Sequence, residues 1–71
     1  MELKSDINAI VSKLEVAAGS DVAADDVLIT LESMKMEVPV NAPVAGRVRS
    51  IAVAEGASVQ EDDVLMVLDP G

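Results

Sequence analysis

Apolar residues along the chain fall into short runs of strand length. Gly46-Arg47-Val48-Arg49 alternates polar and apolar residues, and Val27-Leu28-Ile29-Thr30-Leu31 is an almost continuous apolar run. Both patterns are typical of β-strands, and no stretch supports a helix. The sequence therefore predicts eight strands: Met1–Lys4, Ala9–Val16, a short one at Val22, Val27–Ser33, Met36–Asn41, Gly46–Val53, a short one at Val59, and Val64–Leu68.

The chain contains an internal duplication with an offset of 37 residues. Asp25-Asp26-Val27-Leu28 corresponds to Asp62-Asp63-Val64-Leu65, and the 22 positions from Val11 to Glu32 include 10 identities. Each half is too small to bury an apolar face alone, so we expect the two to pack about an approximate twofold axis. This predicts an all-β fold, a sandwich or flattened barrel of two four-stranded halves in a single domain spanning residues 1–71.

The apolar alternation slips by one residue at equivalent places in the two halves. It runs from Val11 to Leu14 in the first half and from Val48 to Ile51 in the second. A β-bulge produces such a slip, so a shared bulge or bend is predicted in both halves.

Turns are predicted where Gly and Asp accumulate, including the paired acidic residues Asp25-Asp26 and Asp62-Asp63. A calcium site is the alternative for these pairs. Each cluster lacks the alternating oxygen ligands and the Gly of a calcium loop, so turn chemistry is the preferred interpretation.

Composition excludes many kinds of function. The 71 residues include no Cys, His or aromatic residue and carry a formal charge of -8, while 51% are apolar. A positive mean hydropathy of +0.40 argues against disorder. There is no imidazole base, thiolate or usual zinc site, and no basic or stacking surface for nucleic acid. With no membrane-length apolar stretch and no signal or transit peptide, we expect a cytoplasmic protein.

One central segment is not duplicated. Strands ending at Ser33 and starting at Met36 leave only Met34-Lys35 for the connection, which predicts a tight hairpin with the lysine amine in water. Two-residue hairpins prefer Asn-Gly or Gly-Xaa, so this pair must adopt positive φ or form a looser turn. The plainest interpretation is a solvated lysine with two methionines that fill gaps between strands.

The same segment closely resembles the biotinyl and lipoyl attachment domain family. Glu32-Ser33-Met34-Lys35-Met36-Glu37 matches the Glu-Ala/Ser-Met-Lys-Met of its biotin-accepting members, and Ala42-Pro43-Val44-Ala45-Gly46 matches the Ala-Pro-Xaa-Xaa-Gly element that follows. Gly56, Val59 and Leu65 fit the second half, so the resemblance covers nearly the whole chain. Ser5-Asp6-Ile7-Asn8-Ala9 departs from the family, which usually has Pro and Gly there, and this puts the entry into the second strand in question.

The resemblance implies a flattened barrel of two four-stranded antiparallel sheets, with the modified lysine on one hairpin and both termini at the opposite end. It implies that Lys35 receives biotin as an amide. Met34, Met36 and Glu32 would form the hairpin that biotin protein ligase recognises. Glu37 lies in the same hairpin but is less diagnostic. The undisturbed offset leaves no room for the inserted thumb of some bacterial carriers, so the short, thumbless type is expected.

The function implied is that of a biotin carboxyl carrier, not an enzyme. The arm on Lys35 would carry carboxylate from a biotin carboxylase to a carboxyltransferase, whose acceptor is an acyl-CoA or a 2-oxo acid that the carrier sequence does not name. An exposed lysine is mostly protonated near neutral pH, so the ligase should assist its deprotonation. No metal, nucleic acid or membrane is expected as a partner, and the isolated domain is expected to be a monomer.

Two other functions are compatible with the same fold. A lipoyl carrier domain of a 2-oxo acid dehydrogenase has a similar hairpin, but its members commonly have Asp before the lysine and a small residue after it. An unmodified barrel-sandwich module that only contacts other proteins usually lacks Met-Lys-Met at the tip. Met34 and Met36 therefore favour the biotin carrier.

Overall fold

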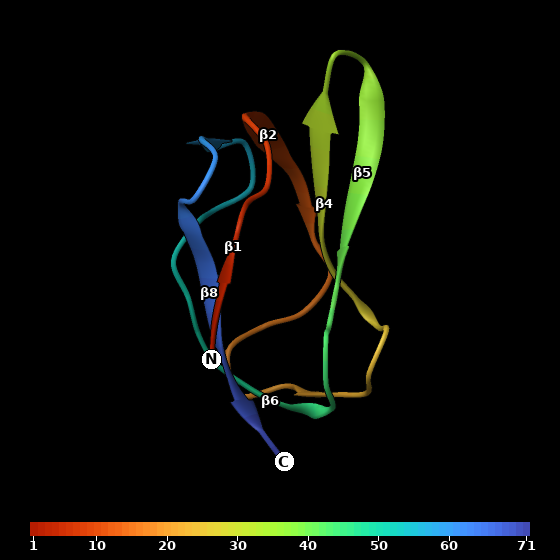
Figure 1. The fold of residues 1–71 in the computed structure, drawn as a ribbon, viewed down its shortest axis with the longest axis vertical. Coiled ribbons are helices and arrows are strands. Elements are labelled where there is room, and N and C mark those ends of the chain that lie inside the picture. The colour runs from red at the N-terminus through yellow and green to blue at the C-terminus, as the bar shows by residue number, and fades with distance from the viewer.

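The computed structural model describes all 71 residues as eight antiparallel strands joined by short turns (Figure 1). Val27–Ser33 and Met36–Asn41 have the predicted bounds, and the others differ by a few residues at their ends. The structure contains no helix long and apolar enough to cross a membrane. The strands are β1 (Glu2–Lys4), β2 (Ala9–Leu14), β3 (Asp21–Val22), β4 (Val27–Ser33), β5 (Met36–Asn41), β6 (Gly46–Ile51), β7 (Ser58–Val59) and β8 (Val64–Pro70).

Two four-stranded sheets form the domain, as predicted, but each half of the sequence does not make its own sheet. One sheet has the order β1-β8-β6-β3 and the other β5-β4-β2-β7. Each sheet therefore takes two strands from each half, because the halves exchange strands across the approximate twofold axis. This exchange lets both sheets bury residues from both halves. In Figure 1 the β4–β5 hairpin stands at one end, and both termini lie toward the other.

The predicted bulges occur at equivalent positions in the two halves. The register between β2 and β4 shifts between Val11 and Lys13, and that between β6 and β8 shifts between Val48 and Ser50. These positions differ by the 37-residue offset. A bulge increases the local twist of a strand, so the paired bulges help both sheets to curl around one core.

Hydrogen bonds outside the sheets follow the same symmetry. Gly19 N donates to Val48 O at 2.7 Å, and Gly56 N donates to Val11 O at the same distance. Both glycines have positive φ, 90° and 86°, a conformation that glycine adopts without steric cost. The two Gly turns therefore connect each half to a strand of the other.

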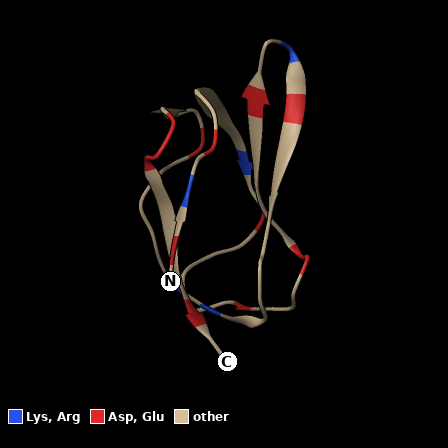
Figure 2. Ribbon diagram, in the orientation of Figure 1, with Lys and Arg blue, Asp and Glu red and all other residues tan.

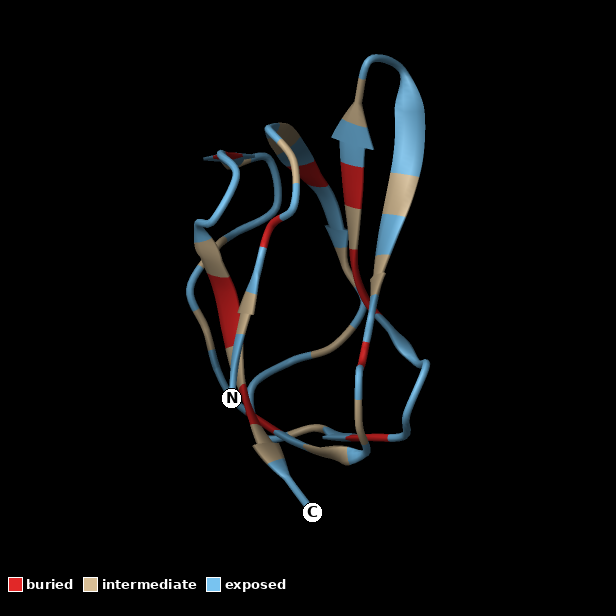
Figure 3. Ribbon diagram, viewed as in Figure 1, coloured by how far each residue is buried: buried red, intermediate tan, exposed pale blue.

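The core consists of residues related by the duplication. All 12 buried residues form six pairs separated by 37 positions. Nearly all are aliphatic, and Figure 3 shows none of them at the outer end of the β4–β5 hairpin. Packing the two halves together thus closes a core that neither half could close alone. The pairs are Ser5 and Ala42, Val11 and Val48, Val22 and Val59, Leu28 and Leu65, Ile29 and Met66, and Leu31 and Leu68.

The paired Asp residues are turn residues. Asp26 Oδ2 accepts from Ala23 N, and Asp63 Oδ2 accepts from Gln60 N, each at 2.8 Å. The preceding residues, Asp25 and Asp62, have φ of 73° and 74°, which Asp tolerates better than most residues. No group of three or more acidic side chains is arranged to hold a metal ion. Turn chemistry therefore explains why both pairs recur.

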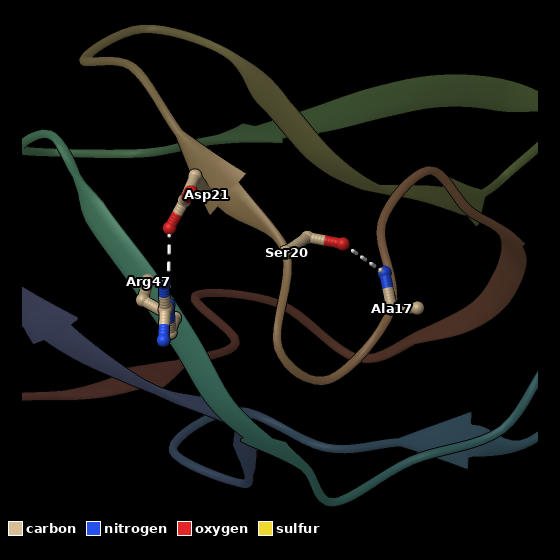
Figure 4. A network of polar contacts seen from close by, with 4 residues as sticks. All are labelled: Ala17, Ser20, Asp21 and Arg47. Carbon is tan, nitrogen blue, oxygen red and sulfur yellow. Dashed lines mark hydrogen bonds and ion pairs between the residues drawn. The ribbon is translucent and has the colours of Figure 1, made fainter.

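Other polar contacts secure the short strand β3 (Figure 4). Ser20 Oγ accepts from Ala17 N at 3.2 Å just before β3 begins. Asp21, within β3, pairs with Arg47 of β6, with Nε and Oδ1 3.0 Å apart. Both side chains are exposed, so this ion pair contributes at most about 1 kcal/mol to stability.

Ser5 makes hydrogen bonds in the turn before β2, which is the segment that lacks the Pro and Gly usual in the family. Ser5 is buried; its Oγ donates to Ile7 O at 2.6 Å and accepts from Ile7 N at 3.3 Å. Its backbone N–H donates to Asp63 O, just as that of Ala42 donates to Asp26 O in the other half. The second strand therefore starts at Ala9, as predicted, although this turn is built differently.

Candidate functional site at the Lys35 hairpin

Lys35 lies at the end of a two-residue turn between β4 and β5. Ser33 pairs with Met36, so only Met34 and Lys35 connect the strands. Their φ values are 52° and 65°, both in the left-handed region. Positive φ at both central residues is the property of a type I′ turn, whose twist matches that of the flanking strands. Of the two predicted turn geometries, the strained one with positive φ is therefore observed.

The Lys35 side chain is exposed and makes no hydrogen bond or ion pair within the chain. Lys4 likewise has no ion pair, whereas Lys13 pairs with Glu15 across 3.4 Å and each arginine has its own Asp partner. The free amine of Lys35 fits a group that attaches through an amide bond, because no acidic neighbour has to be displaced first.

The two methionines beside the lysine are not gap fillers. Met34 is 93% exposed and Met36 is 65% exposed, which are the two highest values among the large apolar side chains exposed in the structure. A domain this small needs most of its apolar residues for its core, so leaving both methionines in water forgoes stabilisation. This pattern is typical of a surface that binds a partner.

Two carboxylates lie directly opposite each other one row below the turn. Glu32 on β4 pairs with Glu37 on β5, and both are exposed. Figure 2 shows the acidic band on each strand beneath the basic tip. Like charges in directly opposed positions destabilise a sheet, so stability does not account for this arrangement.

The apolar residue Ile10 extends this row across the sheet. Ile10 on β2 pairs with Glu32 and is 49% exposed. Ile10 is not among the site residues predicted from the sequence, although a buried Val11 beside it requires Ile10 to face outward from the sheet. Together Ile10, Glu32 and Glu37 form one outer row below the lysine.

The lysine sits on a protrusion and not in a cleft. The one hollow in the structure, of about 420 Å³, lies between β1 and β5 and is lined by residues such as Leu3, Ile7 and Val38, whereas Met34 and Lys35 do not line it. In Figure 3 the whole tip is exposed. The lysine is therefore on an exposed turn, away from the hollow.

Comparison with known proteins shows the family to which this fold belongs. Residues 3–68 match the biotin and lipoyl family described as "Biotin-requiring enzyme". The chain belongs to the biotinyl and lipoyl attachment domain family. A curated relative, the "Biotinylated protein TB7.3 homolog" of Mycobacterium leprae, is 43% identical over 51 residues, which is 72% of each chain. The resemblance seen in the sequence is therefore confirmed, and within the family this chain is of the biotin carboxyl carrier type, with covalently bound biotin as its cofactor.

Parts of two solved carboxylase structures match almost the whole chain. A single-chain, multi-domain long-chain acyl-CoA carboxylase gives a TM-score of 0.95 at 30% identity over 100% of this chain. The urea carboxylase of Kluyveromyces lactis gives 0.90 at 32% identity over 97%. This chain spans only 7% and 6% of those long proteins.

A lipoyl domain shares the fold as well. The lipoyl domain of the 2-oxoglutarate dehydrogenase complex from Azotobacter vinelandii gives a TM-score of 0.87 at 22% identity, over 100% of this chain and 98% of its own. At that identity the match supports the predicted all-β architecture and does not separate a biotinyl from a lipoyl carrier.

The structure places the predicted site residues in one hairpin. Met34 and Lys35 form its turn, Met36 begins β5, and Glu32 precedes the last residue of β4. Glu37, the less diagnostic residue, is the direct partner of Glu32. The individual roles of these residues are taken up below.

Proposed function

We propose that Lys35 is the residue that receives biotin and that this domain carries carboxylate within a biotin-dependent carboxylase. The observation that carries the proposal is the unpaired amine of Lys35 on an exposed type I′ turn, flanked by two solvent-exposed methionines. When bound, biotin supplies the carboxyl-carrying chemistry that the side chains of this chain lack.

The hairpin residues divide into an attachment point and a recognition surface. The Lys35 amine forms the amide bond to the carboxyl group of biotin, after that carboxyl has been activated with ATP by biotin protein ligase. Met34 and Met36 offer apolar contacts to the ligase, while Glu32 offers a charged contact. Burying two exposed methionines in such an encounter is favourable by roughly 1.5–3 kcal/mol for each side chain.

The ligase also has to supply the base. The protonated Lys35 amine must lose one proton before it attacks the activated carboxyl and a second as the amide forms and the activating group leaves, and no acceptor in the chain contacts it. A base on the ligase is therefore required, and the turn serves by holding the amine away from the domain, where that base can reach it.

The same exposure suits the later partners, which we propose are a biotin carboxylase and a carboxyltransferase. The domain performs no catalysis itself and presents the arm on a hairpin anchored to a closed core. Tethering raises the effective concentration of the reactive group at each active site. The substrates that such partners carboxylate are set by the carboxyltransferase.

The test is intact-mass measurement after incubation with biotin ligase, biotin and ATP. We expect one biotinyl adduct, lost in Lys35→Arg and retained in the matched variants Lys4→Arg and Lys13→Arg, which remove the other two lysines. A parallel reaction with lipoyl ligase and lipoate separates the two carrier types, and we expect little or no adduct there. Modification by neither enzyme would refute the carrier proposal.

A further inference from the structure

The two halves of the domain differ where each long strand ends. In the second half β8 stays paired with β6 to its end, because Gly46 pairs with Pro70. The equivalent pair in the first half would be Ala9 and Ser33, and it is absent: the pairing of β2 with β4 stops at Ile10 and Glu32. Ala9 pairs only with Val59 of β7.

One backbone hydrogen bond is also present in the second half and absent from the first. Gly71 N donates to Ala45 O at 3.1 Å, just beyond the end of β8. Its counterpart in the first half would run from Met34 N to Asn8 O, and no such bond forms. Instead, the Asn8 side chain contacts the segment just after β7, where its Oδ1 accepts from Glu61 N at 2.8 Å.

A difference in side chain at one position accompanies both of these differences. A Cβ atom added to Gly46 would lie 2.2 Å from Asp69 O, so only a glycine allows β8 to approach β6 this closely. The equivalent of Gly46 is Ala9, and the equivalent of Asp69 is Glu32. Because Ala9 has a Cβ atom, the end of β4 cannot come as close to β2 as the end of β8 comes to β6.

We propose that Ala9 is a positioning residue that separates the end of the Lys35 hairpin from β2. From Ser33 onward β4 no longer pairs with β2. Its only remaining partner is β5, which is an edge strand. The tip is therefore a free two-stranded ribbon that the ligase can approach from both sides. This rests on the proposed function of Lys35, but its structural part does not depend on modification.

The first test measures amide exchange in the unmodified protein. In Ala9→Gly the bond from Met34 N to Asn8 O can form, so we expect the Met34 amide to exchange about fivefold more slowly, relative to the core amide of Leu28 in the same sample. Using Leu28 as the reference removes any change in global stability. Ala9→Ser keeps the Cβ atom and should leave the Met34 amide as in the parent chain.

The reciprocal variant is Gly46→Ala in the second half. It should speed exchange at Gly71 and leave Met34 unchanged, because it adds the Cβ atom where the structure now lacks one. If this crowded variant does not fold, Ala9→Gly and Ala9→Ser still decide the proposal.

The second test measures biotinylation kinetics with carrier as the variable substrate. Closing one side of the tip should raise the KM of the ligase for Ala9→Gly about threefold with kcat unchanged, since chemistry at the amine is unaffected. Equal Met34 exchange in all variants would overturn the proposal, and so would a slowed amide with an unchanged KM. If the ligase modified no variant, the proposed function would fail while the exchange data still tested the role of Ala9.

Discussion

At the scale of single residues, the most unusual feature is a methionine and a lysine in left-handed backbone conformations. Met34 and Lys35 have φ of 52° and 65°, where Asn and Gly are the preferred residues. Such a conformation costs roughly 1–3 kcal/mol for a residue with an ordinary side chain and is concentrated at functional sites. Because Met34 is almost fully exposed, packing does not offset this cost.

The cost at Met34 is measurable by substitution. Met34→Asn should raise the free energy of unfolding by about 0.5–1 kcal/mol, because Asn tolerates the left-handed region better and the replaced side chain makes almost no contacts. Biotinylation should slow at the same time, because an apolar contact with the ligase is lost. Urea denaturation and initial ligation rates measure the two effects.

The matched control is Met36→Asn. Met36 is also exposed but lies in β5 with an ordinary strand conformation, where Asn is unfavourable. This variant should show no gain in stability. Equal stabilisation by both substitutions would contradict the assignment of strain to the turn.

At the scale of secondary-structure elements, the two turns before β4 and β8 fix where the long strands begin. In each, a second Asp accepts a hydrogen bond from the backbone N–H three residues earlier. The first Asp adopts positive φ, and its N–H donates to a backbone carbonyl in the other half of the chain. Asp25 N donates to Ala42 O, and Asp62 N donates to Ser5 O. These turns therefore connect the halves as well as reversing the chain.

Asp26→Ala and Asp63→Ala should each lower the free energy of unfolding by about 1 kcal/mol, since each leaves one turn N–H without its acceptor. The two values should agree closely, because the turns are related by the duplication. Glu61→Ala, an exposed acidic neighbour whose side chain accepts no bond, should change stability by less than about 0.5 kcal/mol. Thermal denaturation compares the three, and equal losses in all of them would argue against a specific role for the turn carboxylates.

At the scale of the whole molecule, charge and shape act together. The chain carries a formal charge of -8, and its only cation at the tip of the hairpin is Lys35, the residue proposed to receive biotin. Amide formation removes that positive charge, which takes the net charge to -9. The domain is elongated, with extents of 34 × 18 × 17 Å, and the hairpin stands at one end in Figure 2. A strongly charged protein of this kind is steered toward basic surfaces on its partners.

Salt should therefore slow the encounter with the ligase. At carrier concentrations below KM, we expect the biotinylation rate to fall by roughly tenfold as salt rises from low to physiological levels and above, because the charges are screened beyond about 8–10 Å. The rate at saturating carrier should change much less, and this serves as the internal control. A rate that is independent of salt at both concentrations would refute electrostatic steering.

Much of the fold followed from local patterns in the sequence. The strand alternation located all eight strands, and the 37-residue repeat indicated the approximate twofold and the paired bulges at Val11 and Val48. Which strands neighbour one another did not follow, because the repeat is equally compatible with a separate sheet for each half. The pairings of β1 with β8, β3 with β6 and β2 with β7 in the structure show that the halves exchange strands.

Some features of the candidate site were likewise predictable from the sequence, and others are visible only in the structure. The two-residue connection predicted that Lys35 lies exposed in the turn, as the structure shows, since the position of a turn residue depends on its neighbours in sequence, and the Met-Lys-Met segment predicted that it is the attachment point. The opposition of Glu32 and Glu37, the exposure of Ile10 and the separation of the hairpin from β2 depend on cross-strand register. Register is set by packing between distant segments.

The sequence by itself determined that this is a small all-β domain with a two-residue hairpin at its centre, because local periodicity is enough to find the strands and the connection between them, and its motifs indicated the biotin carrier family. Tertiary structure alone decided how that hairpin is presented. The side chain of Ala9 acts on a strand more than twenty residues away, and a contact of that kind exists only once the chain has folded.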